Sequence, residues 1–283
     1  MFLKRVRKME RKLFCEIHPA FYRVSVAKGR ALRHLQNLRD HACLATERRD
    51  EELPNLVKGH TSIILRKLEG VDMQLQESKK VNLALAAQEI NGLVIHPGET
   101  FSFWFLVGKP THRRGYQDGL VIASDDLRAE TGGGLCQLAN MVHYLVLNSP
   151  LEVTELHHHT DALFPDDRRR VPFGTGTSVF YNYIDYRFRN NTRQDVQLLL
   201  WIEDDVLNGE LRSEWAFPNR YKLVEENHHF RREGDDFYRI SQVYKIWIDR
   251  RSGREMNREL ILDNHSKVMY DHALIPESEI RDD

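Results

Sequence analysis

The sequence predicts an α+β fold, in which N-terminal helices precede a mixed or antiparallel sheet packed on a central helix. Three observations predict it. Apolar residues recur at helical spacing as far as about residue 147, aromatic and aliphatic residues alternate with polar ones beyond Pro150, and the chain contains no internal repeat or low-complexity linker. With 283 residues, 41% of them hydrophobic, the chain can bury a sizeable core.

The first element is a basic helical region over residues 1–55, followed by an α+β domain over residues 56–283. Its basic stretches are "MFLKRVRKMERKLF" and "RVSVAKGRALRHLQNLRD", and Pro54 ends it. The pattern is typical of a solvated helical face. Contact with a phosphate, a nucleic acid, a membrane surface or a protein partner is the alternative. Because 41 basic and 42 acidic residues nearly cancel over the whole chain, overall charge disfavours nucleic acid as a partner.

The sequence shows no export or membrane-spanning signal. No stretch approaches the roughly 20 apolar residues that cross a bilayer, and no apolar segment follows the basic N-terminus. We therefore expect a cytoplasmic protein. Its cysteines, Cys15, Cys43 and Cys136, are odd in number and lack C-x-x-C pairs, which predicts free thiols rather than a disulfide framework or a cysteine-built zinc site.

The next helix lies within "QLQESKKVNLALAAQEING", residues 74–92. Its apolar residues at i, i+3, i+4 and i+7 predict a stripe facing the core, and Gly92 marks the end. The stripe consists of Leu83, Ala86, Ala87 and Ile90. A strand, a turn at Pro97 and Gly98, and a second aromatic strand are expected over residues 93–104.

A central helix is expected to follow the glycines of "ETGGGLCQLAN", residues 130–140. Leu135, Leu138, Ala139 and Val142 hold the helical spacing, which places Cys136 in the first turn. Strands are expected after Pro150, in "TSVFYNYIDYRFRN" and "YRISQVYKIWID". In "VQLLLWIEDDVLNGEL" the pattern predicts a hairpin with its turn at Asn208 and Gly209.

The glycine-cysteine element could carry chemistry. A helix N-terminus favours a thiolate, so it can lower the pKa of Cys136 and make it a nucleophile. Gly132, Gly133 and Gly134 could bring backbone amides close to a substrate, and with Gln137 they would stabilise an oxyanion. Two other interpretations stay open: a packing cysteine after an ordinary turn, and an anion held at the helix N-terminus.

A histidine cluster follows in "TELHHHTDALFPDD". In an extended conformation His157, His159 and Asp161 share one side, where a histidine could act as a base and Asp161 could orient it. The same three residues could bind a divalent metal, or the histidines could be structural. Arg169 and its neighbours in "DDRRRVPFGTG" could receive a carboxylate or phosphate, or form a solvated loop.

These motifs resemble the VanW family over nearly the whole chain. The resemblance rests on the opening helices, "HPGETFSFW", "GGGLCQLANMVHYL", "ELHHHTDALFPDDRRRVPFGTG" and "VFYNYIDYRFRNNT". Leu156 and Thr160 depart from the residues that many relatives carry. The matching positions are Gly132, Gly133, Gly134, Cys136, Gln137, His157, His159, Asp161, Pro165, Asp166 and Arg169.

The resemblance implies an accessory protein linked to glycopeptide resistance or to cell-envelope precursors, and it names no reaction and no cofactor. The hypothesis from the residues is a Cys136-centred site for a small amide-containing ligand, with Arg169 and the glycines among the binding groups. A non-enzymatic binding or scaffold protein and a metal-dependent hydrolase are the alternatives, so the sequence leaves open whether the chain is an enzyme.

Overall fold

The computed structural model describes residues 19–39, 43–65, 73–123, 126–158, 161–162, 165 and 171–281. It confirms the predicted α+β class, with a helix before the sheets and a central helix that starts at the glycine motif. Cys15, His159 and Arg169 lie outside the described residues.

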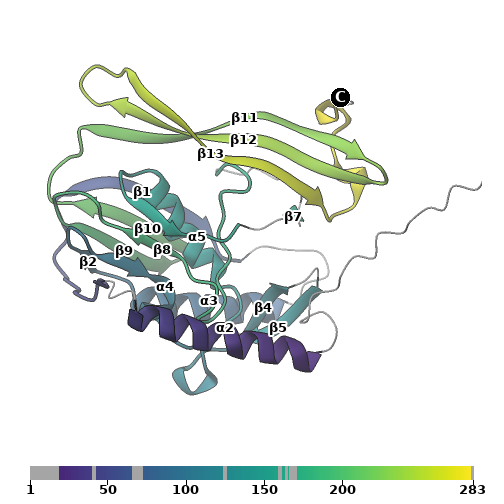
Figure 1. The fold of residues 1–283 in the computed structure, drawn as a ribbon, viewed down its shortest axis with the longest axis horizontal. Helices are drawn as coiled ribbons and strands as arrows, with labels where there is room; N and C mark the ends of the chain where they lie inside the picture. Colours follow the sequence, from purple (N-terminus) through teal and green to yellow (C-terminus); the bar gives the residue numbers. More distant parts are fainter. Residues whose placement is uncertain are drawn as a thin grey trace, which may run out of the picture.

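The main sheet has four strands in the order β1-β10-β9-β2, all antiparallel, and two helices pack on it (Figure 1). One helix, α5, contacts β1 and β10, and the other, α3, contacts β9. The four residues of the expected apolar stripe in and after α3 are all buried in the core between these layers. The elements are β1 (Asn55–Ile63), β2 (Leu93–Ile95), β9 (Val196–Glu203), β10 (Val206–Ser213), α3 (Met73–Gln88) and α5 (Cys136–Leu147).

The hairpin formed by β9 and β10 is present, but its predicted turn is wrong. Asp204 and Asp205 make the turn, both with positive φ (46° and 62°), whereas Asn208 and Gly209 lie inside β10 opposite Trp201 and Leu200. The glycine has a packing reason instead, because a Cβ at Gly209 would lie 2.9 Å from the Met141 side chain of α5. Asparagine and aspartate both tolerate left-handed turn conformations, so the Asn-Gly pair was the misleading signal.

Two smaller sheets flank the main one. The first has the order β3-β8-β6 and leads into the short helix α4, which begins after Ser102. The second is the β4–β5 hairpin, which contacts α3 and leads into the glycine turn. A strand was predicted over residues 177–190. Only its end forms one, β8, and an isolated bridge joins Phe180 and Ile184. The bounds are β3 (Thr100–Ser102), α4 (Phe103–Val107), β4 (Asp118–Ala123), β5 (Asp126–Thr131), β6 (Glu152–Glu155) and β8 (Arg187–Arg189).

The C-terminal strands form a sheet of their own, which Figure 1 shows across the upper side of the molecule. Its order is β11-β12-β13-β7, with long antiparallel strands and a parallel edge at β7. A small separate core, which includes Phe173, Phe230 and Val268, packs on it. The strands are β7 (Asp161–Ala162), β11 (Asn219–Glu233), β12 (Asp236–Asp249) and β13 (Glu255–Val268).

The N-terminal region is helical in part. Helix α2 (Pro19–Arg39) lies along the lower side of the body in Figure 1, opposite the C-terminal sheet. Residues 43–50, expected to be helical, instead run as an extended segment that pairs at Leu44 and Arg48 with Thr100 and Leu93. The reason is tertiary: backbone groups of the β2–β3 region form hydrogen bonds with this segment.

The short 3₁₀ turns lie after α4 and near the C-terminus, at His112–Arg114, His272–Leu274 and Glu277–Glu279. The Pro97–Gly98 turn forms as predicted. Of the helices in the described ranges, none combines the length and the hydropathy that crossing a bilayer requires.

Candidate functional site

The glycine turn before α5 is packed too closely for any side chain. A Cβ at Gly133 would lie 2.1 Å from the carbonyl carbon and oxygen of Gly119 in β4. A Cβ at Gly132 would lie 2.6 Å from Pro110, and one at Gly134 would lie 2.2 Å from Cγ of Lys79. Gly132 and Gly134 also have positive φ, 83° and 93°. Close packing therefore accounts for all three glycines.

Asn82 of α3 fixes this turn, and sequence reasoning missed it. Its side chain is fully buried and donates to the carbonyls of Gln117 and Gly133, each at 3.0 Å. Its Oδ1 accepts from the Gln117 amide at 2.8 Å. A polar residue inside the apolar stripe of a helix was the available signal, because buried amides need partners.

Two of the glycine amides already have backbone acceptors at the base of the β4–β5 hairpin. Gly132 N–H donates to the Gln117 carbonyl and Gly133 N–H donates to the Glu130 carbonyl, both at 2.9 Å. These amides hold the β4–β5 hairpin and the turn together. The expected role of the motif in stabilising an oxyanion would have to come from other amides at the start of α5.

Cys136 lies in the first turn of α5, as predicted, and is half-buried against the core. Its Sγ is 3.8 Å from the Val179 carbonyl. Burial raises the pKa of the Cys136 thiol above its ordinary value, and backbone hydrogen bonds with Val179 and with its own amide act in the opposite direction. This direction is the reverse of the lowered pKa expected for a thiol at a helix N-terminus. Cys43 and Cys136 are both free thiols.

Gln137 joins α5 to the main sheet. Its side-chain nitrogen donates to Ser62 Oγ and to the Ile63 carbonyl of β1, both at 2.9 Å. Both amide hydrogens are therefore used in packing the helix on the sheet.

His157 lies near Cys136 along the backbone of residues 178–179. The Ser178 amide donates to the His157 carbonyl at 2.7 Å, and the next residue, Val179, contacts the Cys136 thiol. The imidazole is directed elsewhere: its Nε2 is 3.1 Å from Glu155 Oε1. The carboxylate that orients His157 is therefore Glu155.

Asp161 does not share a strand with His157. Strand β6 ends at Glu155 and pairs with β8, whereas Asp161 starts β7 and pairs with Lys267 of the C-terminal sheet. The two residues are therefore not aligned on one strand, because β6, which precedes His157, pairs with one sheet and β7, which starts at Asp161, pairs with another. Within the described residues, no group of three or more His, Cys, Asp and Glu side chains is arranged to hold a metal ion.

Glu155 belongs to a buried ion network. Arg33 of α2 donates to it through both terminal nitrogens, one of them at 2.7 Å, and Arg187 Nε lies 3.7 Å from its Oε2. Burial raises the pKa of Glu155, but hydrogen bonds from Arg33 and His157 outweigh it, so the net pKa lies below the ordinary value. His157 therefore has an ionised carboxylate beside it at neutral pH.

His143, on α5, is fully buried with its Nδ1 3.1 Å from the Tyr186 hydroxyl. Burial, helped by the charges of His158 and Lys245, lowers the pKa of His143 to about 3. It is therefore neutral at physiological pH and acts as a core residue.

We expect His143 to make the protein acid-sensitive. The unfolded chain protonates this histidine near pH 6.5 and the folded chain only near pH 3, so its contribution is complete above pH 6.5 and is lost as the pH falls toward 3. A loss on the order of a few kcal/mol should appear in urea unfolding of wild type at pH 4 against pH 7. His143→Gln should flatten that difference, whereas the exposed control His112→Gln should not; equal slopes in all three proteins would contradict this assignment.

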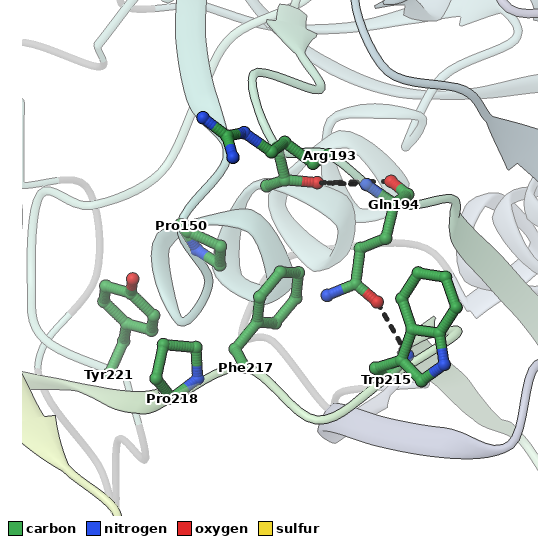
Figure 2. A pocket seen from close by; sticks show the side chains of 8 residues that line it. Pro150, Arg193, Gln194, Trp215, Phe217, Pro218 and Tyr221 are labelled. Carbon is green, nitrogen blue, oxygen red and sulfur yellow. Dashed lines mark hydrogen bonds between the residues drawn. The ribbon is translucent and has the colours of Figure 1, made fainter.

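An aromatic pocket of about 330 Å³ lies apart from Cys136, where the main sheet passes into the C-terminal sheet (Figure 2). Three parts of the chain form it: the residues just after α5, the turn between β8 and β9, and the link from β10 into the start of β11. No sequence motif indicated it. Its lining consists of Pro150, Thr192, Arg193, Gln194, Trp215, Phe217, Pro218 and Tyr221.

The polar groups of this pocket are mainly donors. Gln194 Oε1 accepts from the Trp215 backbone amide at 2.6 Å, which orients the side-chain amide and leaves its NH₂ on the pocket side of Figure 2. Arg193 adds an exposed guanidinium. Next to Tyr221, the Lys245 ammonium donates to the Ser149 carbonyl at 2.7 Å and lies 5.0 Å from the Tyr221 ring. Burial lowers the pKa of Lys245 to about 8, so it is still mostly charged at neutral pH.

The fold and the site together define an α+β protein in which a glycine turn, locked by Asn82, starts the central helix at a cysteine. A family model described as "VanW like protein" matches residues 78–212, the part that contains this turn. The chain is 30% identical over 239 residues to the Vancomycin B-type resistance protein VanW of Enterococcus faecalis, covering 84% of this chain and 86% of that protein. The chain belongs to the VanW family.

A second relative is the Uncharacterized protein YoaR of Bacillus subtilis. It is 29% identical over 154 residues, and the match spans 51% of this chain and about half (49%) of that protein. No solved structure shows a significant match to the chain.

Proposed function

We propose that this VanW-family chain is an accessory protein that binds a small amide-containing ligand with a free carboxylate in the aromatic pocket. The observation that carries the proposal is the lining of the pocket, in which the donors of Arg193 and Gln194 accompany apolar side chains that include Trp215 and Phe217. Such a combination is typical of ligand sites, where apolar walls give affinity and a few polar groups give orientation.

The chemistry of the pocket selects acceptor-rich ligands. The Gln194 NH₂ would donate to an amide carbonyl, and the Arg193 guanidinium would pair with a carboxylate. The flat rings of Trp215 and Phe217 suit an amide plane or short aliphatic side chains. A volume of about 330 Å³ suits a ligand the size of a dipeptide. Peptide parts of cell-envelope precursors belong to this class, which agrees with the resistance-protein name of the Enterococcus relative.

Thiol chemistry at Cys136, with His157 as the base, is the second candidate function. The half-buried position of Cys136 in the first turn of α5 and its backbone link to His157 favour it. The raised thiol pKa and the pairing of His157 with Glu155 count against a reactive thiolate at rest. We therefore place binding before catalysis.

Calorimetric titration with N-acetyl-alanyl-alanine, compared with its C-terminal amide, tests the binding proposal. We expect the carboxylate form to bind more tightly, because only it can pair with Arg193. Arg193→Gln should weaken binding of the carboxylate form about tenfold, the effect of losing one charge-assisted hydrogen bond. Trp215→Ala should also weaken it, whereas Arg250→Gln, an exposed arginine in the β12–β13 turn, should have no effect.

The same proteins distinguish the two candidates. Cys136→Ser should bind as wild type does, and intact-protein mass should show no adduct after incubation with the dipeptide. Equal affinity for the acid and the amide, or an unchanged Arg193→Gln, would overturn the pocket assignment. An acyl adduct that disappears in Cys136→Ser would favour the thiol candidate instead.

A further inference from the structure

Helix α2 docks on the body through its polar face. Arg30 Nε donates to the Tyr181 carbonyl at 3.1 Å, and Arg33, only 9% exposed, donates to Glu155. One turn further, Asn37 Oδ1 accepts from Arg187 at 2.6 Å. These three positions repeat at helical spacing and define the inner side of the helix.

The outer side of α2 carries exposed apolar side chains beside the basic Lys28 and Arg39, whereas a surface helix usually turns its apolar side inward. Its large side chains are strongly exposed, Val24 at 57%, Leu32 at 55%, Leu35 at 62% and Leu38 at 74%. At 100° per residue, Val24, Leu35 and Leu38 lie within a 60° sector opposite Arg33, and Leu32 lies beside that sector. The outer face of α2 is defined here as these four residues. Such a face needs a partner, because an exposed apolar stripe is costly in water.

The charge of α2 and of the residues before it indicates which kind of partner binds the outer face. Helix α2 contains no acidic residue, and Arg23, Lys28 and Arg39 are exposed on it. The preceding 18 residues add Lys4, Arg5, Arg7, Lys8, Arg11 and Lys12 against Glu10 and Glu16. A second copy of the chain would bring two such basic segments together, and their repulsion opposes that contact. An anionic surface attracts the same charges.

We propose that the outer face of α2 docks on an anionic phospholipid bilayer. The helix lies in the plane of the interface, with the four apolar side chains among the upper acyl chains and the basic residues at the headgroups. With 21 residues it is about 30 Å long, enough to rest along the surface. Because the C-terminal sheet lies on the opposite side of the body in Figure 1, docking leaves it facing away from the lipid. This proposal is independent of the ligand proposed above.

Vesicle co-sedimentation of the full chain tests the proposal. Vesicles of phosphatidylglycerol and phosphatidylcholine should pellet the wild type, whereas pure phosphatidylcholine should pellet little of it. Leu35→Glu combined with Leu38→Glu should reduce the partition coefficient at least about tenfold, since burying one leucine already contributes about that factor. The matched control, Met256→Glu with Leu260→Glu, changes two exposed apolar residues of β13 and should bind as wild type does.

Unfolding midpoints equal to the wild type would show that the variants fold, as expected for side chains this exposed. No binding of the wild type to anionic vesicles overturns the proposal. Unchanged binding of the α2 variant to anionic vesicles also overturns it, because the basic residues alone would then account for the binding. A wild-type dimer in sedimentation equilibrium that the α2 variant abolishes would assign the face to a second copy instead.

Discussion

Replacing Asp185 with alanine is expected to lower the free energy of unfolding by about 3–5 kcal/mol, because it leaves the buried Arg187 without the carboxylate to which it is hydrogen-bonded. Asp185 has no exposed surface. Its Oδ2 accepts from Ser102 at 2.6 Å and from Arg187 Nε at 2.8 Å. Its Oδ1 accepts from the backbone amides of Trp104 and Tyr186. The substitution removes the acceptor for all of these donors.

Urea unfolding monitored by circular dichroism measures the effect. Asp185→Asn should cost less than Asp185→Ala, because the amide oxygen can still accept while the charge is lost. Asp205→Asn is the control: it removes the ion pair with Lys80 at the exposed turn between β9 and β10, where an ion pair contributes little, and it keeps a side chain that tolerates the positive φ of this position. Equal effects at Asp185 and Asp205 would mean that the buried network adds nothing to stability.

This network also decides how α2 is attached. Arg187 contacts Asp185, Glu155 and Asn37, and Glu155 in turn holds Arg33 and His157. Loss of Asp185 should therefore loosen α2 from the body. Proteolysis within α2 is expected to become faster in Asp185→Ala than in wild type.

Adding a methyl group at Gly133 is expected to destabilise the fold by about 3 kcal/mol or more, at the upper end of overpacking effects. The new Cβ would lie 2.1 Å from the Gly119 carbonyl, a backbone group that cannot rotate away. Relief requires the β4–β5 hairpin to move from the start of α5, which would break the Asn82 hydrogen bonds to Gln117 and Gly133.

Gly253→Ala is the matched control for this substitution. Gly253 has a positive φ of 70°, but a Cβ added there would have no atom within 4 Å, so only the backbone preference is lost, about 1 kcal/mol. Thermal unfolding of the two variants should separate a clash from a φ preference. If Gly133→Ala were no more harmful than Gly253→Ala, the turn would have space, and its glycines would be available for a ligand.

The local patterns were predictable wherever side-chain spacing alone decides. The apolar spacing of Leu83, Ala86, Ala87 and Ile90 located α3 and its buried side, and the spacing after the glycines located α5 with Cys136 in its first turn. The expected hairpin and the later strand run located β9, β10 and β12, whereas the alternating stretch over residues 177–190 forms only β8 and an isolated bridge. These features depend on residues close in the chain, where helix and strand periods can be read directly.

The environment of each site residue was decided by contacts between distant segments. Burial against the core raises the pKa of Cys136, and no residue near Cys136 in the chain indicates that burial. Likewise, His157 pairs with Glu155 because Arg33 and Arg187 hold that carboxylate in place. Asp161, the expected partner, belongs to another sheet. Burial and charge depend on the whole fold, so spacing could not predict these pKa directions.

The sequence by itself determined the α+β class, the family, the helix that begins at Cys136 and the basic character of the N-terminal region. Only the tertiary structure decided that close packing requires the glycines, that the aromatic pocket forms between Pro150, Gln194 and Trp215, and that α2 turns its leucines outward. The physical reason is the range of the forces involved. The periodicity of a sequence indicates which residues can be buried together. Hydrogen bonds and ion pairs between distant residues, such as Arg33 with Glu155, determine which face of an element is turned inward.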